Sequence, residues 1–150
     1  MKLGIISDTH GLLRESVLLK LSECDYILHA GDIDRPAVLE KLESLAPVYV
    51  VEGNNDWEFS GRLPIRIDVT LEGLRICMAH RRMDLPADLS PFGLAVCGHS
   101  HRFELSRLGN TVILNPGSCG RSRFGRALTM ATAEVTGGVP TVTRIDIDEL

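Results

Sequence analysis

Short apolar runs in the first half of the chain alternate with segments whose apolar residues recur every three or four positions. The runs typical of buried strands are residues 2–7, 26–28 and 48–51. Helical spacing predicts one amphipathic helix over residues 12–22 and a second that begins at Pro36, with Asp34 or Arg35 near its cap. This order of elements is typical of a parallel sheet with helical crossovers.

The second half of the chain has a different pattern, which predicts mostly antiparallel strands. Apolar and polar residues alternate over residues 65–71, as in a half-buried strand. Turn residues such as Gly109-Asn110 and the segment 136–140 predict hairpins. Further strands are expected at residues 74–79, 94–97, 103–108, 111–114, 126–135 and 141–147. We therefore predict an α/β protein of one domain, residues 1–150, with two sheets packed face to face and helices outside them.

Polar side chains follow five of the predicted strands at the point where each strand ends. Sites in open α/β sheets lie just beyond the carboxyl ends of strands, so these side chains are expected at one edge. An extended backbone would also aim residues two positions apart in the same direction, as in the pairs Asp8/His10 and His99/His101. The complete set is Asp8, His10, Asp32, Asn54, His80, His99 and His101.

The donor set indicates a metal site. It mixes oxygen and imidazole ligands without thiolate, which suits Mn²⁺, Fe²⁺, Ni²⁺, Co²⁺ or Zn²⁺. Seven side chains are too many for one ion and suit two, with Asp32, alone on its loop, as the bridge. Two ions roughly 3.5–4 Å apart can hold a hydroxide between them and clamp the oxygens of an in-line displacement. With two carboxylates and a hydroxide the site keeps a small positive charge, which suits a phosphodiester.

Composition and the lengths of the apolar runs limit the cellular location and the binding partners of the protein. The net charge of −4 argues against a basic surface for large nucleic acids. No apolar stretch has the length or flanks of a signal peptide or a membrane span. The four cysteines lack CxxC spacing, so we interpret them as reduced, buried thiols. These features predict a cytoplasmic protein without a membrane partner.

The ordered blocks DTH, GD, GNND, a lone histidine and GHSH resemble the calcineurin-like metallophosphoesterase superfamily. The short chain, the opening KLGIISDTH and the segment Asn115–Ser118 are similar to its small prokaryotic phosphodiesterase branch, from residue 2 to about 147. The resemblance implies a four-layer α/β/β/α sandwich. It also implies a metal-dependent phosphodiesterase in which a metal-bound hydroxide attacks phosphorus.

The resemblance further implies which side chains hold each ion. The first ion would be held by Asp8, His10, Asp32 and His101. The second would be held by Asp32, Asn54, His80 and His99. We expect two manganese ions, with iron, nickel, cobalt or zinc as alternatives. The residues that we expect to act in catalysis are Asp32, His99 and Asn55.

The sequence departs from the family pattern at two places. Asn55 stands where many members have a histidine, and an amide cannot act as a general acid at neutral pH. Arg81-Arg82 follows His80 where glycine and histidine are common. In addition, the stretch between His80 and His99 is short and contains Pro86 and Pro91, so a helix usual there is expected to be reduced or lost.

Several residues have two interpretations. His29 lies in an apolar strand and is expected to be a hydrogen-bonded residue that supports the ligands or packs in the core, rather than a ligand. Arg81 is either a solvated side chain or, like Asn55, a contact to the phosphate group. The same alternatives apply to Arg82, Arg121 and Arg123.

Asn115–Ser118 is either a tight turn or a loop that shapes the site. Trp57 and Phe59 line a pocket mouth, pack in the core or form an oligomer contact.

These observations predict hydrolysis of phosphodiesters in preference to monoesters, with a small phosphate ester as substrate. One alternative is a non-catalytic scaffold, because a retromer subunit has the same fold that the resemblance implies for this chain. Another is nuclease or RNA-processing activity, against which the acidic composition counts. A homo-oligomer is left open.

Overall fold

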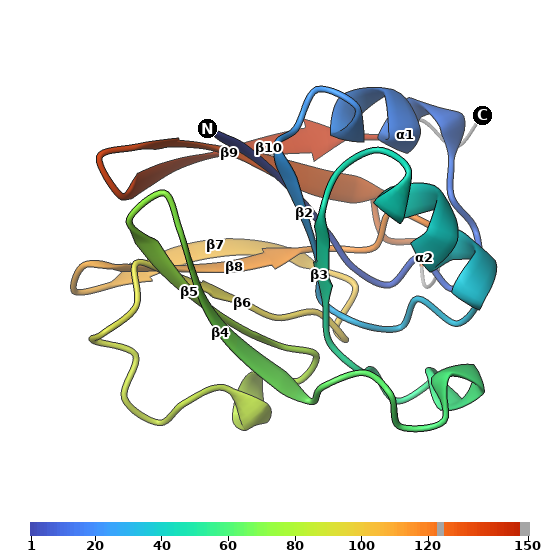
Figure 1. Ribbon diagram of the computed structural model, residues 1–150, viewed down its shortest axis with the longest axis horizontal. Coiled ribbons are helices and arrows are strands. Elements are labelled where there is room, and N and C mark those ends of the chain that lie inside the picture. Colours follow the sequence, from blue (N-terminus) through green and yellow to red (C-terminus); the bar gives the residue numbers. More distant parts are fainter. Residues whose placement is uncertain (123–124, 148–150) are drawn as a thin grey trace.

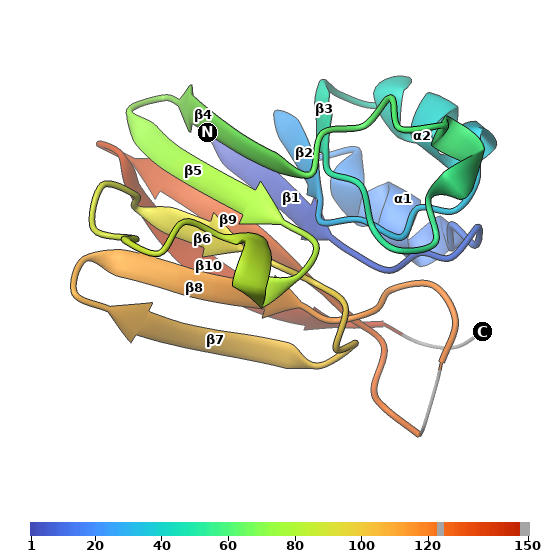
Figure 2. The same cartoon turned by 90° about the horizontal axis from the view of Figure 1, so that it is seen from below.

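The computed structural model describes residues 1–122 and 125–147. Within these residues two five-stranded mixed sheets pack face to face (Figures 1 and 2). The first sheet has the order β10-β9-β1-β2-β3. Its strands are β1 (Lys2–Ile6), β2 (Tyr26–His29), β3 (Val48–Val50), β9 (Thr129–Thr136) and β10 (Val139–Asp146). Strands β1, β2 and β3 are parallel, as the pattern of the first half predicts, and β9 pairs antiparallel with β1 and β10.

Two helices, α1 (Glu15–Leu21) and α2 (Pro36–Glu43), cover the outer face of the first sheet (Figure 1). Their buried residues, such as Leu21 and Leu42, pack against Ile6 and Ile27 of the sheet. Helix α1 begins three residues later than predicted, because His10 and Gly11 have left-handed backbones and Leu12 closes a turn onto Thr9.

The start predicted for α2 is confirmed, with Arg35 rather than Asp34 as its cap. The N-cap is Arg35, whose backbone is extended, and Pro36 occupies the first helical turn as expected. No side chain caps this end of the helix. The carboxylate of Asp34 instead turns away toward the loop after β1.

The second sheet has the order β4-β5-β6-β8-β7. Its strands are β4 (Arg66–Leu71), β5 (Leu74–Ala79), β6 (Leu94–Val96), β7 (Phe103–Leu108) and β8 (Thr111–Pro116). The hairpins β4–β5 and β7–β8 are antiparallel, as expected. The central strands β5, β6 and β8 are parallel, so the prediction of a mostly antiparallel second half is wrong at the middle of this sheet. Pairing between distant strands is not encoded in local periodicity.

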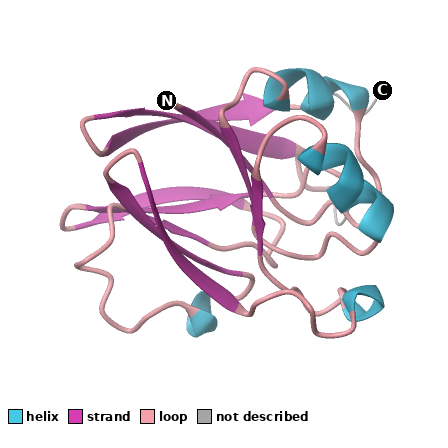
Figure 3. Ribbon diagram, viewed as in Figure 1, coloured by secondary structure: helices cyan, strands magenta, loops and turns pink. Residues whose placement is uncertain are grey.

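The outer face of the second sheet is covered by residues 80–93, which contain a single 3₁₀ turn, η2 (Arg82–Asp84), and otherwise irregular chain (Figure 3). Leu85, Leu89 and Phe92 from this segment pack on the sheet around Cys77. The expected loss of a helix between His80 and His99 is therefore confirmed. The sandwich keeps its four layers, but the fourth is made by loop.

The main core lies between the two sheets. It is built from alternate residues of facing strands, including Leu3, Ile5, Leu28, Ile76 and Met78. In the last hairpin the turn is tighter than predicted: Gly137 and Gly138 both have positive φ, and β10 begins directly at Val139. No helix in the described part of the chain is long and apolar enough to span a membrane.

Candidate metal centre

Loops that follow β1, β2, β3, β5 and β6 bring the predicted ligands together at one end of the sandwich. The backbone there is not extended, as the two-residue spacing had suggested, but left-handed. Positive φ angles between 48° and 74° occur at Asp8, His10, Asp32, His99 and His101. Each such residue costs roughly 1–2 kcal/mol relative to an ordinary conformation. This concentration of strained residues is typical of a functional site held in place by its surroundings.

Backbone hydrogen bonds fasten the first two loops to each other. The amide of Asp8 donates to the carbonyl of Gly31 at 3.0 Å, and the amide of His10 donates to the carbonyl of Asp32 at the same distance. These bonds continue the pairing of β1 and β2 beyond the regular strands. The loops therefore carry Asp8, His10 and Asp32 as one unit.

The first cluster of potential ligands, here called the Asp8 group, consists of Asp8, His10 and His101. Oδ1 of Asp8 lies 3.3 Å from Nε2 of His101 and 3.6 Å from Nε2 of His10. The two imidazole nitrogens lie 3.3 Å from each other. Oδ1 of Asp8 is buried and has no hydrogen-bond partner among the described residues. A buried carboxylate oxygen without a donor, facing two imidazoles, suits a cation.

The second cluster, here called the Asp32 group, consists of Asp32, Asn54, His80 and His99. Oδ2 of Asp32 lies 3.3 Å from Nε2 of His80. Oδ1 of Asn54 lies 3.1 Å from the same nitrogen and 3.2 Å from Nδ1 of His99. The two imidazole nitrogens are 3.3 Å apart.

Asp32 connects the two clusters. Its Oδ2 atom lies 3.7 Å from Nε2 of His10 in the Asp8 group, as well as next to His80. All seven predicted ligands are therefore joined by distances below 4 Å. The position of Asp32 between the groups is the one expected of a bridging ligand.

The Nδ1 atoms of two histidines are already engaged, which orients their rings. Nδ1 of His80 donates to the carbonyl of Ala30 at 2.7 Å, and Nδ1 of His10 donates to Oδ2 of Asp34 at 3.1 Å. In neutral rings this leaves each Nε2 as a lone pair directed into the site. Such partners fix the tautomer of metal-binding histidines.

Sequence reasoning missed Asp34 and Asp56 as parts of this site. The buried carboxylate of Asp56 accepts backbone hydrogen bonds from Gly53, Asp32 and Asp34 at 2.8–2.9 Å. It thereby ties the loop after β3 to the loop after β2. Asp32, Asp34 and Asp56 lie close enough to resemble a further metal cluster. Because both Asp56 oxygens are occupied by N–H groups, we assign Asp56 a structural role.

The protonation of the site reflects its mixed charges. Burial raises the pKa of Asp8, but the imidazoles of His10 and His101 outweigh it and hold that pKa far below its ordinary value. Burial likewise opposes the shift at Asp32, whose pKa is lowered mainly by His80. The pKa values of His10 and His80 are raised against burial, by Asp8 and Asp32 respectively. Carboxylates that stabilise an imidazolium in this way also stabilise a divalent ion.

His29 is a core residue and not a ligand, as predicted. It is fully buried; Nε2 contacts Oγ1 of Thr9 at 3.0 Å, and Nδ1 accepts a hydrogen bond from the amide of Gly31 at 3.1 Å. Burial lowers the pKa of His29 to about 4. Its neutral ring therefore holds the loop after β1 through Thr9 and the loop after β2 through Gly31.

Two residues that were considered as substrate contacts lie at the rim of the site. Asn55 donates to Asp32 through its backbone amide at 2.9 Å and its side-chain amide at 3.4 Å. Arg81 is exposed and lines two hollows. His99 lines the first of them together with Arg81, and His80 lines the second. Arg82 and Arg121 are also exposed, and Arg123 lies outside the described residues.

The remaining ambiguous residues can now be placed. Asn115 lies near the end of β8, and its Nδ2 donates to Gly98 and Ser100 at 3.0 Å, so it supports the chain on both sides of His99. This favours the interpretation of Asn115–Ser118 as a segment that shapes the site, although its first two residues belong to β8. Phe59 is buried in the outer core, whereas Trp57 is 75% exposed.

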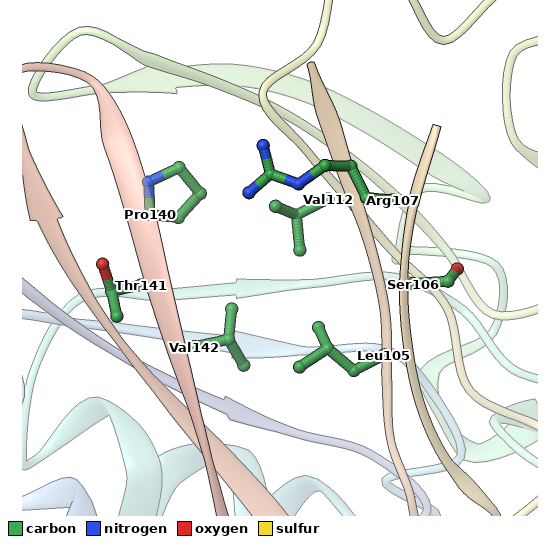
Figure 4. A pocket seen from close by; sticks show the side chains of 7 residues that line it. All are labelled: Leu105, Ser106, Arg107, Val112, Pro140, Thr141 and Val142. Carbon is green, nitrogen blue, oxygen red and sulfur yellow. The ribbon is translucent and has the colours of Figure 1, made fainter. Parts of the chain in front are cut away.

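A separate hollow of about 400 Å³ lies between β7, β8 and β10 (Figure 4). Leu105, Val112 and Val142 provide its apolar surface, and Arg107 lies at its edge. It contains none of the predicted ligands, so it is distinct from the metal centre.

Comparison with known proteins assigns the family. The model of the calcineurin-like phosphoesterase superfamily domain matches residues 1–138. A probable metallophosphoesterase of Methanothermobacter thermautotrophicus is 34% identical over 132 residues, which cover 79% of this chain and 77% of that protein. A phosphodiesterase of Methanocaldococcus jannaschii is 24% identical, covering 79% of this chain and 84% of that protein. The chain therefore belongs to the calcineurin-like phosphoesterase superfamily, as its motifs indicated.

Solved structures confirm the fold class. Vps29 from Chaetomium thermophilum superposes with a TM-score of 0.79 at 19% identity, covering 98% of this chain and 95% of that one. At this level of identity the likeness concerns the fold alone. The predicted sandwich of two mixed sheets is thus confirmed, with irregular chain in place of helices in its fourth layer.

Proposed function

We propose that this protein is a two-metal phosphoesterase that hydrolyses phosphodiesters in preference to monoesters. The observation that carries the proposal is the position of Asp32, whose Oδ2 atom lies within 3.7 Å of imidazoles from both ligand clusters. Two divalent ions bound there would activate water for attack on phosphorus and polarise the phosphoryl oxygens. Membership of the phosphoesterase superfamily supports the same chemistry.

The side chains of the chain divide this task. The Asp8 group would hold one ion and the Asp32 group the other, with Asp32 shared. The orphan oxygen of Asp8 and the nitrogen lone pairs left on His10 and His80 fit this role. We propose manganese as the native ion, on the donor set alone. Metal analysis of protein purified without chelators tests that choice against iron, nickel, cobalt and zinc.

Asn55 and Arg81 are our candidates for contacts to the phosphate. Asn55 already donates to Asp32, which places its side-chain amide at the edge of the ligand set. Arg81 is exposed next to Asn54, His80 and His99, so its guanidinium is free to turn toward an anion. We propose no general acid at Asn55, because an amide cannot supply a proton at neutral pH.

The test is an assay of the manganese-reconstituted protein with bis(p-nitrophenyl) phosphate and p-nitrophenyl phosphate. We expect faster release of nitrophenolate from the diester and loss of activity with EDTA. Faster turnover of the monoester would contradict the diester preference. Activity on neither ester with any of the five metals would contradict the enzymatic proposal.

A scaffold protein with this fold is the alternative. A protein without catalysis is free to lose ligands, whereas here all seven positions hold side chains that can bind metal, each within 4 Å of a neighbour. Equilibrium dialysis separates the two. We expect close to two manganese ions per chain, and fewer than about one would favour the scaffold.

We also propose a cytoplasmic location and a small phosphate ester as the partner, without membrane or long nucleic acid. The four cysteines are buried and unpaired, which suits a reducing compartment. Localisation of a tagged chain by fractionation tests this. Any self-association is open to measurement by light scattering.

A further inference from the structure

A groove of about 600 Å³ begins at the metal centre and runs over the second sheet. We call it the His99 groove. One wall comes from Arg81 together with Arg82 and Met83 of η2. The other comes from Glu104 of β7, and Cys97 and Asn115 lie between the two walls. Because His99 belongs both to the groove and to the Asp32 group, a phosphate bound at the metals would direct one of its ester substituents into this space.

A second hollow, of about 210 Å³, lies on the other side of Arg81. It is smaller, and two carboxylates, Glu52 and Asp84, stand at its edge. These negative charges disfavour a further phosphate there. The arrangement therefore suits an ester with one large substituent in the His99 groove, and it disfavours a continuing polynucleotide chain.

The polar side chains between the two walls of the His99 groove are already engaged: Oγ of Ser100 accepts from Nδ2 of Asn115 and from the amide of Arg102. The amide of Asn115 is committed, since Nδ2 donates to Gly98 and Ser100 and Oδ1 accepts from the amide of Gly117. Cys97 is a buried free cysteine, and a thiol is only a weak hydrogen-bond donor. Polar recognition in the groove must therefore come from its rim.

The rim combines three kinds of contact. Arg82 supplies donors and Glu104 supplies acceptors, and neither side chain forms a hydrogen bond or ion pair within the described ranges. Met83 lies next to Arg82 with 81% of its surface exposed. A thioether is a soft, polarisable surface that makes favourable contacts with aromatic rings. A ligand matched to this rim is flat and presents both donors and acceptors at its edge.

We propose that the His99 groove binds the nucleoside of a mononucleotide phosphodiester, with the base between Met83 and Glu104. A nucleobase has the required planar face, ring N–H or amino donors for Glu104, and carbonyl or ring-nitrogen acceptors for Arg82. This inference rests on the proposed phosphodiesterase activity and adds a substrate class to it.

The experiment compares two diesters that share the p-nitrophenolate leaving group. They are thymidine 5′-(p-nitrophenyl phosphate) and methyl p-nitrophenyl phosphate. We expect kcat/KM to be about tenfold higher for the nucleoside ester, the size of one base-stacking contact. Equal values would overturn the nucleoside site and leave the phosphodiesterase proposal intact. Hydrolysis of neither ester would overturn both.

Two exposed substitutions then locate the site. Met83→Ala and Glu104→Gln are expected to remove most of the preference for the nucleoside ester while kcat/KM for the methyl ester stays unchanged. Glu134→Gln, at an exposed position on β9, is the matched control and should leave both values unchanged. A preference that survives both groove substitutions would place the nucleoside elsewhere.

Discussion

Oδ2 of Asp34 accepts a hydrogen bond from Nδ1 of His10 at 3.1 Å, and this contact sets the direction of a predicted metal ligand. Asp34 itself has a left-handed backbone, with φ at 69°, and lies just before α2. It is the residue that a helix-cap interpretation would assign to α2. The structure assigns it to the metal centre.

Removal of this carboxylate should weaken metal binding. Asp34→Ala leaves the His10 ring without its partner, and the loss of such a contact typically lowers metal affinity by about 10- to 100-fold. Titration calorimetry with manganese measures the change. Asp88→Ala is the control, because Asp88 is exposed and, within the described part of the chain, its carboxylate accepts only from Ser90. Unchanged affinity in Asp34→Ala would show that His10 is oriented by other contacts.

Asp56 should matter for stability more than for metal chemistry. Asp56→Ala leaves the amides of Gly53, Asp32 and Asp34 without their acceptor. Each unsatisfied buried donor costs about 1–3 kcal/mol, so we expect the free energy of unfolding to fall by about 3 kcal/mol or more. Urea denaturation in EDTA measures this. A loss no larger than that of Asp88→Ala would refute the role.

His29 should make folding stability depend on pH. Its pKa is about 4 in the folded protein, lowered by burial from an ordinary value of 6.5. Between these values the unfolded chain binds more protons, so stability falls as the pH falls from about 6.5 to 4, by about 3 kcal/mol in total. His29→Gln should flatten this dependence. Urea denaturation in EDTA at pH 7, 6 and 5 gives the difference between the two proteins, and parallel curves would contradict the assignment.

Arg81 should affect substrate binding without affecting the metals. Arg81→Ala is expected to raise KM for bis(p-nitrophenyl) phosphate by about tenfold, the loss of one charge-assisted contact, with manganese affinity unchanged. Arg107→Ala, in the separate hollow of Figure 4, is the control. Unchanged KM in Arg81→Ala would return Arg81 to the class of solvated side chains.

The sequence allowed the convergence of the seven side chains to be predicted, because each of their segments follows a buried strand and strand ends converge. It did not reveal how the loops are shaped. Nothing in the spacing of Asp8 and His10 distinguishes an extended from a left-handed backbone. Asp34 was missed because its partner, His10, lies 24 residues away in the sequence. Asp56 was missed because it binds main-chain amides, at Asp32 and Asp34, that lie 24 and 22 residues away and that no motif displays. The final Asp of the GNND block was the one available signal.

The parallel pairing of β5, β6 and β8 was missed for a related reason. Each strand is short and apolar, so its local pattern is compatible with either direction. The direction of β6 is set by the irregular segment 80–93, which returns the chain to the opposite end of the sheet, and that of β8 by its hairpin with β7. By contrast, Pro86 and Pro91 are local signals, and the loss of a helix could be predicted from them.

Both ligand clusters take members from both sheets. Asp8 and His10 follow β1 while His101 precedes β7, and Asp32 follows β2 while His80 follows β5. Two bound ions would therefore cross-link the two sheets, and neither sheet alone could form either cluster. Separation of the layers would require release of both ions. Resistance to unfolding would then rise with the logarithm of free metal concentration, and the ions would keep the two halves of the molecule in register.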